Sequence, residues 1–247
     1  MKDEEIDDLL KKAARAPHEV KAETLERAAD SIKATLVPVR PLPPAWVMTG
    51  GVMLVCAAVS LAGAARAGFF GFAKMDLLER ALIFPALLLF AWAAGNAFVD
   101  EMIPGSLRRV SPGALLGFGC AALLGVFGFL FRDYHTDHFV SVGIVCLLTG
   151  LLHALPAGLL SWLVLRRGFA VNFVSAGLAA GMLGGLAGVG VLELHCPNFE
   201  AAHVLVWHTA VVPLSGLLGA LAGWALRLRS GSLAPAGAGQ ESSRRAR

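Results

Sequence analysis

Six long apolar stretches, the first beginning at Trp46, restrict the folds open to this chain more than any other feature. Each is close to the roughly 20 mostly apolar residues that a helix needs to cross a bilayer. Only 16% of the residues are charged, and nearly all of these lie outside the stretches, whereas a soluble domain carries about 25%. We therefore predict an all-α fold, a polytopic membrane helix bundle of about six transmembrane helices. The expected helices cover residues 46–65, 79–99, 113–131, 139–164, 170–192 and 203–226.

Composition divides the chain into three parts. Residues 1–45 are polar and end in the proline-rich segment 38–44, which cannot continue a helix. Residues 46–228 form the predicted six-helix transmembrane domain. Residues 229–247 are rich in Gly, Ala, Ser and Arg, a composition that predicts a disordered basic tail.

The distribution of lysine and arginine predicts the orientation in the membrane. These residues gather in the N-terminal region, in the pairs Arg108-Arg109 and Arg166-Arg167, and in the tail, and they are sparse in the alternate loops. Because basic residues are enriched on the cytoplasmic side of a membrane, both termini are predicted to be cytoplasmic. The net charge of +3 is mild, and acidic residues are mixed with basic ones near the N-terminus, which argues against direct nucleic-acid binding.

Apolar residues recur at helical spacing within residues 1–36 and predict two short amphipathic helices, separated at Ala16-Pro17-His18. A short helix of this kind presents an apolar stripe that cannot form a core alone. The stripe suits helix-in-groove binding to a partner protein, and equally a position on the membrane surface or against the loops of the bundle. The candidate partner-binding residues are Ile6, Leu9, Leu10, Val20, Leu25, Ile32 and Leu36.

The segment between the fifth and sixth expected helices concentrates metal-ligand residue types. Imidazole and thiolate are what zinc and similar ions prefer, and further histidines lie in the loop between the third and fourth helices, on the same predicted face. The spacing matches no zinc motif of known specificity. Three interpretations stay open: a metal site, a redox-sensitive Cys196, and a structural loop of solvated residues, which the sequence favours. The candidate metal ligands are His195, Cys196, His203, His135 and His138.

Two histidines, His153 and His208, fall inside the fourth and sixth expected helices. A polar side chain in hydrocarbon is costly and usually faces the bundle interior, so we expect both to form hydrogen bonds across the bundle rather than to act in catalysis. The sequence contains no phosphate-binding loop, no nucleophile elbow and no zinc-protease motif. An enzyme is therefore not predicted.

The fifth expected helix is short of bulky residues and contains small-xxx-small spacings. Such faces allow helix backbones to approach closely in lipid. We predict close packing within one bundle rather than a dimer motif. The glycines concerned are Gly177, Gly181, Gly184, Gly185 and Gly188.

The pattern His195-Cys196-Pro197, followed by Leu205-Val206-Trp207 and a Gly-rich run, resembles the NrsF-like membrane anti-sigma factors. The resemblance implies about six transmembrane helices with a short cytoplasmic N-terminal region, in the bacterial inner membrane. The implied activity is to hold an extracytoplasmic-function sigma factor inactive, which makes that sigma factor and the lipid bilayer the expected partners. No cofactor is implied, apart from a metal ion acting as a signal.

We therefore predict an anti-sigma factor that releases its sigma factor on an envelope signal, a metal ion or a redox change. The sensor candidates are His195, Cys196 and Pro197, which lie on the predicted outer face. Two alternatives stay open. One is a transporter of small solutes or ions with His153 and His208 along its path, and the other is a membrane-embedded enzyme that uses the outer His/Cys loop.

Overall fold

The computed structural model divides into two compact units, Met1–Leu42 and Pro43–Arg247. Its described part is helical apart from short turns and connections. The structure describes residues 5, 8, 11–12, 22–35, 42–103, 110–134, 138–165 and 172–232.

In the described part of the first unit, α2 (Ala22–Thr35) corresponds to the second expected amphipathic helix. Leu25 and Ile32 lie on it with 58% and 59% of their surface exposed. Residues seven apart share one face of an α-helix, so the two side chains form an exposed apolar pair. The other candidate partner-binding residues, Ile6, Leu9, Leu10, Val20 and Leu36, lie outside the described residues.

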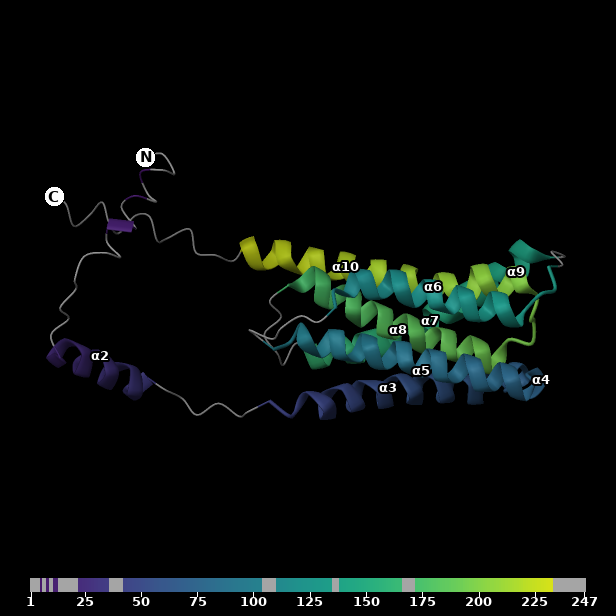
Figure 1. Ribbon diagram of the computed structural model, residues 1–247, viewed down its shortest axis with the longest axis horizontal. Coiled ribbons are helices and arrows are strands. Elements are labelled where there is room, and N and C mark those ends of the chain that lie inside the picture. The colour runs from purple at the N-terminus through teal and green to yellow at the C-terminus, as the bar shows by residue number, and fades with distance from the viewer. Residues whose placement is uncertain are drawn as a thin grey trace. The chain divides into compact units, whose positions relative to one another are not determined.

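The described residues of the second unit include six helices long and apolar enough to cross a membrane, as the sequence predicts. Figure 1 shows them side by side, with the short helices α4 and α9 at the same end of the bundle. Five of the six are α3 (Ala45–Ala67), α5 (Leu77–Asp100), α6 (Pro112–Leu130), α7 (Phe139–Leu165) and α8 (Phe173–His195). The sixth is a continuous helical segment of α9 (Ala201–His203), the π-helical turn η1 (Val204–His208) and α10 (Thr209–Ser232). It extends past the expected end at residue 226, and the tail after Ser232 lies outside the described residues.

Helix α8 occupies the centre of the bundle. Its membrane window is 72% buried, against 44% or less for the other five. Its glycines meet the backbones of the neighbouring helices: a Cβ at Gly184 would lie 2.6 Å from the carbonyl oxygen of Ala154 on α7. A Cβ at Gly181 would collide with the carbonyl oxygen of Ser215 on α10. The predicted close packing within one bundle is therefore confirmed.

The substitution Gly181→Ala is expected to lower the free energy of unfolding by about 1–3 kcal/mol, because the added methyl group forces α8 and α10 apart. The control is Gly117→Ala on α6, where a new Cβ would have nothing within 4 Å. It should leave stability unchanged or slightly raise it through better helix propensity. Unfolding of the detergent-solubilised protein in SDS, followed by circular dichroism, measures both. Equal stability of the two variants would contradict the packing described here.

The short helix α4 (Phe70–Lys74) is fixed against its neighbours by specific contacts. The guanidinium of Arg80 on α5 lies 4.3 Å from the ring centre of Phe72 and donates to the Phe72 carbonyl oxygen at 2.9 Å. Gly71 lies against the end of α8, where a Cβ would be 2.7 Å from the carbonyl oxygens of Glu193 and Cys196. Helix α4 thus packs directly against the turn that follows α8.

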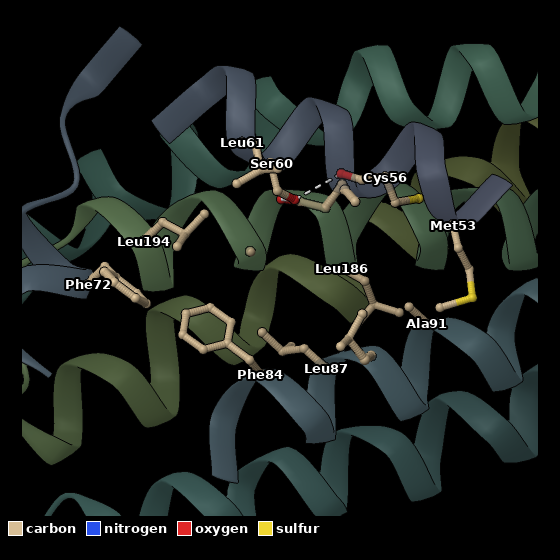
Figure 2. Close-up of a pocket in the computed structure, with 14 residues that line it drawn as sticks. Met53, Cys56, Ser60, Leu61, Phe72, Phe84, Leu87, Ala91, Leu186 and Leu194 are labelled. Carbon is tan, nitrogen blue, oxygen red and sulfur yellow. Dashed lines mark hydrogen bonds between the residues drawn. The ribbon is translucent and has the colours of Figure 1, made fainter. Parts of the chain in front are cut away.

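A cavity of about 320 Å³ lies between α3, α5 and α8 (Figure 2). Apolar side chains such as Phe84, Leu87 and Leu186 make up most of its lining. The Ser60 hydroxyl is 3.0 Å from the carbonyl oxygen of Cys56 and 2.9 Å from that of Ala187, so its hydrogen bond is made within the protein. The lining suits an apolar chain better than a hydrated ion.

Candidate functional site

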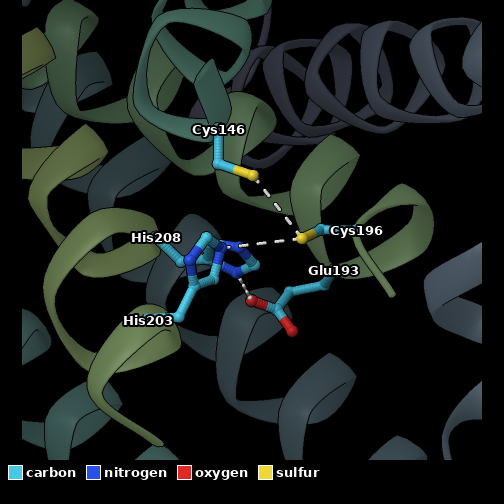
Figure 3. Close-up of polar contacts among 5 residues, drawn as sticks. All are labelled: Cys146, Glu193, Cys196, His203 and His208. Atoms are coloured by element: carbon cyan, nitrogen blue, oxygen red, sulfur yellow. Dashed lines mark hydrogen bonds and ion pairs between the residues drawn. The ribbon is translucent and has the colours of Figure 1, made fainter. Parts of the chain in front are cut away.

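Four side chains with metal-ligating atoms meet at the α4/α9 end of the bundle (Figure 3). Cys146 comes from α7, Cys196 follows the last residue of α8, His203 ends α9 and His208 ends η1. One ligand atom from each lies within 4.8 Å of the others. We call these four residues the thiol–imidazole cluster.

The distances in this cluster fit a tetrahedral ion. The Sγ atom of Cys196 lies 3.5 Å from Sγ of Cys146 and 3.6 Å from Nε2 of His203. Bond lengths of about 2.3 Å to sulfur and about 2.0–2.1 Å to nitrogen place tetrahedral ligands about 3.8 Å apart for two sulfurs and about 3.6 Å apart for sulfur and nitrogen. Two thiols and two imidazoles in this arrangement favour zinc among the common ions.

Burial sets this cluster apart from surface histidines and cysteines. His203 and His208 are fully buried and Cys196 is 3% exposed, whereas Cys146 is half-buried. Within the described part of the chain, Nε2 of His208 has no hydrogen-bond partner. A buried polar atom left unpaired costs about 1–3 kcal/mol, which a bound ion would offset.

A π-helical turn brings the two histidines of the sixth helix onto one face. His203 and His208 are five residues apart, which in an α-helix would separate them by about 140° around the axis. In η1 the N–H of Thr209 donates to the carbonyl oxygen of Val204, an i→i+5 bond that widens the turn. The two imidazole rings consequently lie 5.1 Å apart, edge to face.

A carboxylate forms a hydrogen bond with one of these histidines. Glu193 Oε1 lies 2.7 Å from Nδ1 of His208, and both side chains are fully buried. The expected fifth helix ended at residue 192, but α8 continues to His195, so Glu193 lies in its last turn. The interpretation of this segment as a loop of solvated residues is wrong for Glu193, Cys196 and His203, because the ends of α7, α8 and α10 enclose them.

The groups around Cys196 shift the pKa of its thiol in opposite directions. The hydrogen bond with Cys146 and burial both raise the pKa of the Cys196 thiol, while His203 and His208 lower it, and the net effect is a raised pKa. The thiol is therefore the resting form at neutral pH. Binding a metal ion there would displace its proton.

The remaining sensor and ligand candidates lie apart from the cluster. His195 Nδ1 is 3.1 Å from the Gly68 carbonyl oxygen and its ring contacts Phe70. The carbonyl oxygen of Pro197 accepts a hydrogen bond from Lys74 Nζ at 3.2 Å. These contacts hold the His-Cys-Pro turn against α4 and direct His195 away from the thiols.

The described residues of the loop between α6 and α7 contribute no ligand to the cluster. His138 is described and is not among the clustered ligands; its carbonyl oxygen accepts from Val142 N–H and Ser141 Oγ. His135 lies outside the described residues. Among the described residues, Ala201 N–H donates to the Asp133 carbonyl oxygen at 2.6 Å and thereby connects this loop to the start of α9.

The two intramembrane histidines behave differently. His208 does form the expected hydrogen bond across the bundle, to Glu193 on α8. His153 Nδ1 instead lies 2.8 Å from the Thr149 carbonyl oxygen, one turn back on its own helix. Its ring packs against Gly63 on α3, which leaves the space for it by having no side chain.

Sequence reasoning named two of the four cluster residues as ligands, Cys196 and His203. Cys146 is not among the predicted ligands, and His208 is predicted only as an intramembrane polar group. The available signal was position: Cys146 lies two turns from the start of α7, at the end of the bundle that also carries Cys196. Their position at the same end of the bundle does not predict a contact between Cys146 and Cys196 unless α7 is known to pack against α8.

The fold and this site define a class of protein: a multi-pass membrane protein of six helices with a buried thiol–imidazole cluster at one end. A family model described as NrsF, negative regulator of sigma F, matches residues 33–228. The chain belongs to the NrsF family, and is thus a negative regulator of a sigma factor rather than an enzyme. Searches of curated proteins and of solved structures gave no match. The resemblance seen around His195-Cys196-Pro197 is confirmed, while most of α2 precedes the matched region.

Proposed function

We propose that this protein holds an extracytoplasmic-function sigma factor inactive at the bacterial inner membrane and releases it when a metal ion or an oxidant reaches the thiol–imidazole cluster. Membership of the NrsF family supports the negative regulation of a sigma factor. The observation that supports the signal is the cluster itself, in which two thiols and two imidazoles converge within 4.8 Å. The donor set favours a zinc-like divalent ion as the metal.

The proposal assigns the two ends of the bundle to the two sides of the membrane. The chain enters α3 at Ala45, and α3 extends for 23 residues, about 35 Å, before α4 packs against the cluster turn. The N-terminal entry and the cluster therefore lie at opposite ends of the bundle. The lysine and arginine bias supports a cytoplasmic N-terminus and C-terminus, which puts the cluster on the outer side.

The sigma factor is proposed to dock on the N-terminal segment. Leu25 and Ile32 offer an exposed apolar pair on α2, flanked by charged side chains such as Arg27 and Asp30. An amphipathic helix of this kind binds by placing its apolar face in a groove of the partner. The docking residues predicted before Ala22 belong to the same proposal.

Coupling between the two ends is proposed to occur through α8. This helix carries Glu193 in its last turn and is followed directly by Cys196. It packs backbone to backbone on α7, which carries Cys146, and on α10, which continues from the segment that carries His203 and His208. Ligation or oxidation that draws the three helix ends together would shift α8 as a rigid element. Tightly packed helices respond by discrete shifts rather than by continuous deformation.

Membrane vesicles of defined orientation test the proposal. The cognate sigma factor is expected to bind inverted vesicles that contain the protein, because these expose the cytoplasmic face, and not sealed right-side-out vesicles. Zn²⁺ or an oxidant enclosed in the lumen of the inverted vesicles, where the outer face of the protein lies, should release the bound sigma factor. Binding to right-side-out vesicles alone would contradict the orientation, and binding to neither would contradict the partner.

A further inference from the structure

We infer that Glu193 is a positioning residue for a metal ion in the thiol–imidazole cluster: its carboxylate fixes His208 so that Nε2 is held ready to bind the ion. This inference rests on the metal-binding part of the proposed function. It assigns a role to a buried acid that is not itself a ligand.

The first observation concerns the two ring nitrogens of His208, which have different surroundings. His208 Nδ1 lies 2.7 Å from Glu193 Oε1, a distance at which a carboxylate accepts the proton of Nδ1. In the neutral ring with that tautomer the lone pair is on Nε2, the nitrogen that would bind an ion. That nitrogen is buried and has no hydrogen-bond partner within the described part of the chain.

The second observation separates Glu193 from the ligands. The set of His, Cys, Asp and Glu groups whose ligand atoms lie within 4.8 Å of one another includes Cys146, Cys196, His203 and His208, and among the described residues Glu193 is not part of it. Figure 3 shows its carboxylate against the His208 ring rather than between the thiols. A carboxylate that accepts from a ligating histidine sets the tautomer and ring orientation and raises the basicity of the bound nitrogen.

The third observation concerns the free-energy cost of burying the Glu193 carboxylate. Glu193 is fully buried, and a buried carboxylate without a compensating partner is strongly unfavourable. Packing alone would be served as well by a neutral side chain of the same size at this place. The pairing with His208 accounts for its presence in the last turn of α8, where the helix places it one turn from Cys196.

The fold contains a matched control. Glu101 is 2% exposed and accepts a hydrogen bond from Ser175 Oγ at 2.8 Å, near the start of α8. It is a buried acid against the same helix, at the opposite end of that helix from the cluster. Glu101→Gln and Glu193→Gln therefore make the same substitution at two buried positions against α8, of which only Glu193 contacts a cluster residue.

The test is titration of the purified full-length protein in detergent with Co²⁺, followed by displacement with Zn²⁺. Wild type and Glu101→Gln are expected to bind one Co²⁺ with equal affinity and to show sulfur-to-cobalt absorption. Glu193→Gln should bind about 10–100-fold more weakly while keeping the same absorption bands, since all four ligands remain. His208→Ala should change the bands themselves.

Glu193→Asp supports the test if Glu193→Gln does not fold, because it keeps the charge but withdraws the carboxylate by about 1.5 Å, and should also weaken binding. Equal affinity of wild type and a folded Glu193 variant would overturn this inference and leave the metal site intact. Failure of the wild type to bind Co²⁺ would overturn the metal site as well. It would leave the binding of a sigma factor untouched, because the vesicle experiment measures that binding without metal.

Discussion

Cys196→Ser is expected to abolish release of the sigma factor by both metal ions and oxidants while leaving the protein inserted in the membrane and bound to the sigma factor. The Cys196 thiol lies 3.5 Å from Cys146 Sγ and 3.6 Å from His203 Nε2, so both chemistries pass through it. Loss of a direct ligand should reduce metal affinity by more than about 100-fold, beyond the effect of losing an outer hydrogen-bond partner. Sigma-dependent transcription, measured with and without the inducer, gives the response.

Variants of the other cluster residues separate the two signals. Cys146→Ser should behave as Cys196→Ser, because either thiol alone can neither complete the ligand set nor pair with the other. His203→Ala should lose the metal response and keep the oxidant response, since the two thiols remain. The control is Cys120→Ser on α6, a thiol outside the cluster. An unchanged metal and oxidant response in Cys196→Ser would remove the cluster from the signalling proposal.

The double substitution Leu25→Asp/Ile32→Asp is expected to reduce sigma-factor affinity by at least about 100-fold. Burying a side chain of this size at an interface stabilises the complex by about 1.5–3 kcal/mol, and two such losses correspond to a factor of that order or more. The side chains are already exposed, so membrane insertion and the bundle should be unaffected. Binding of the purified sigma factor to inverted vesicles measures the effect.

Arg27→Glu provides the control for this pair. It changes the net charge by the same two units but acts on the opposite face of α2, about 200° from Leu25. Arg27 is well exposed and pairs with Glu23 one turn away, and an exposed helix pair of this kind contributes only about 0.3–0.5 kcal/mol. If Arg27→Glu and the double variant weakened binding equally, the effect would come from charge and the apolar face would not be the docking surface.

The sequence was sufficient to predict the transmembrane helices, because hydrocarbon imposes a length and a composition that can be read one segment at a time. It was insufficient where a helix end is polar and buried. Glu193 was placed in a loop because an acid beside an apolar stretch usually marks the water boundary. The structure extends α8 by one turn beyond the apolar run and closes it with Cys196 N–H donating to Leu192 O at 2.7 Å.

The cluster was only half predictable for a related reason. Cys196 and His203 are close in sequence and their chemistry draws attention, whereas Cys146 is 50 residues from Cys196 and meets it only through the pairing of α7 with α8. His208 required a further detail, the π-helical turn. An ordinary α-helix from Ala201 would direct His208 away from His203, and no residue in the segment 204–208 announces the wider turn.

The glycines of α8 have a consequence for the thiol–imidazole cluster at the end of this helix. Gly188 lies against the carbonyl oxygen of Gly150 and the side chain of Val211, which are one turn from Cys146 and close to His208 respectively. The thickness of α8 at this level therefore sets the distance between the helices that hold one thiol and one imidazole. For the proposed metal site, a side chain at Gly188 would therefore separate two ligand-bearing segments, although it lies outside the cluster and touches none of the ligands itself.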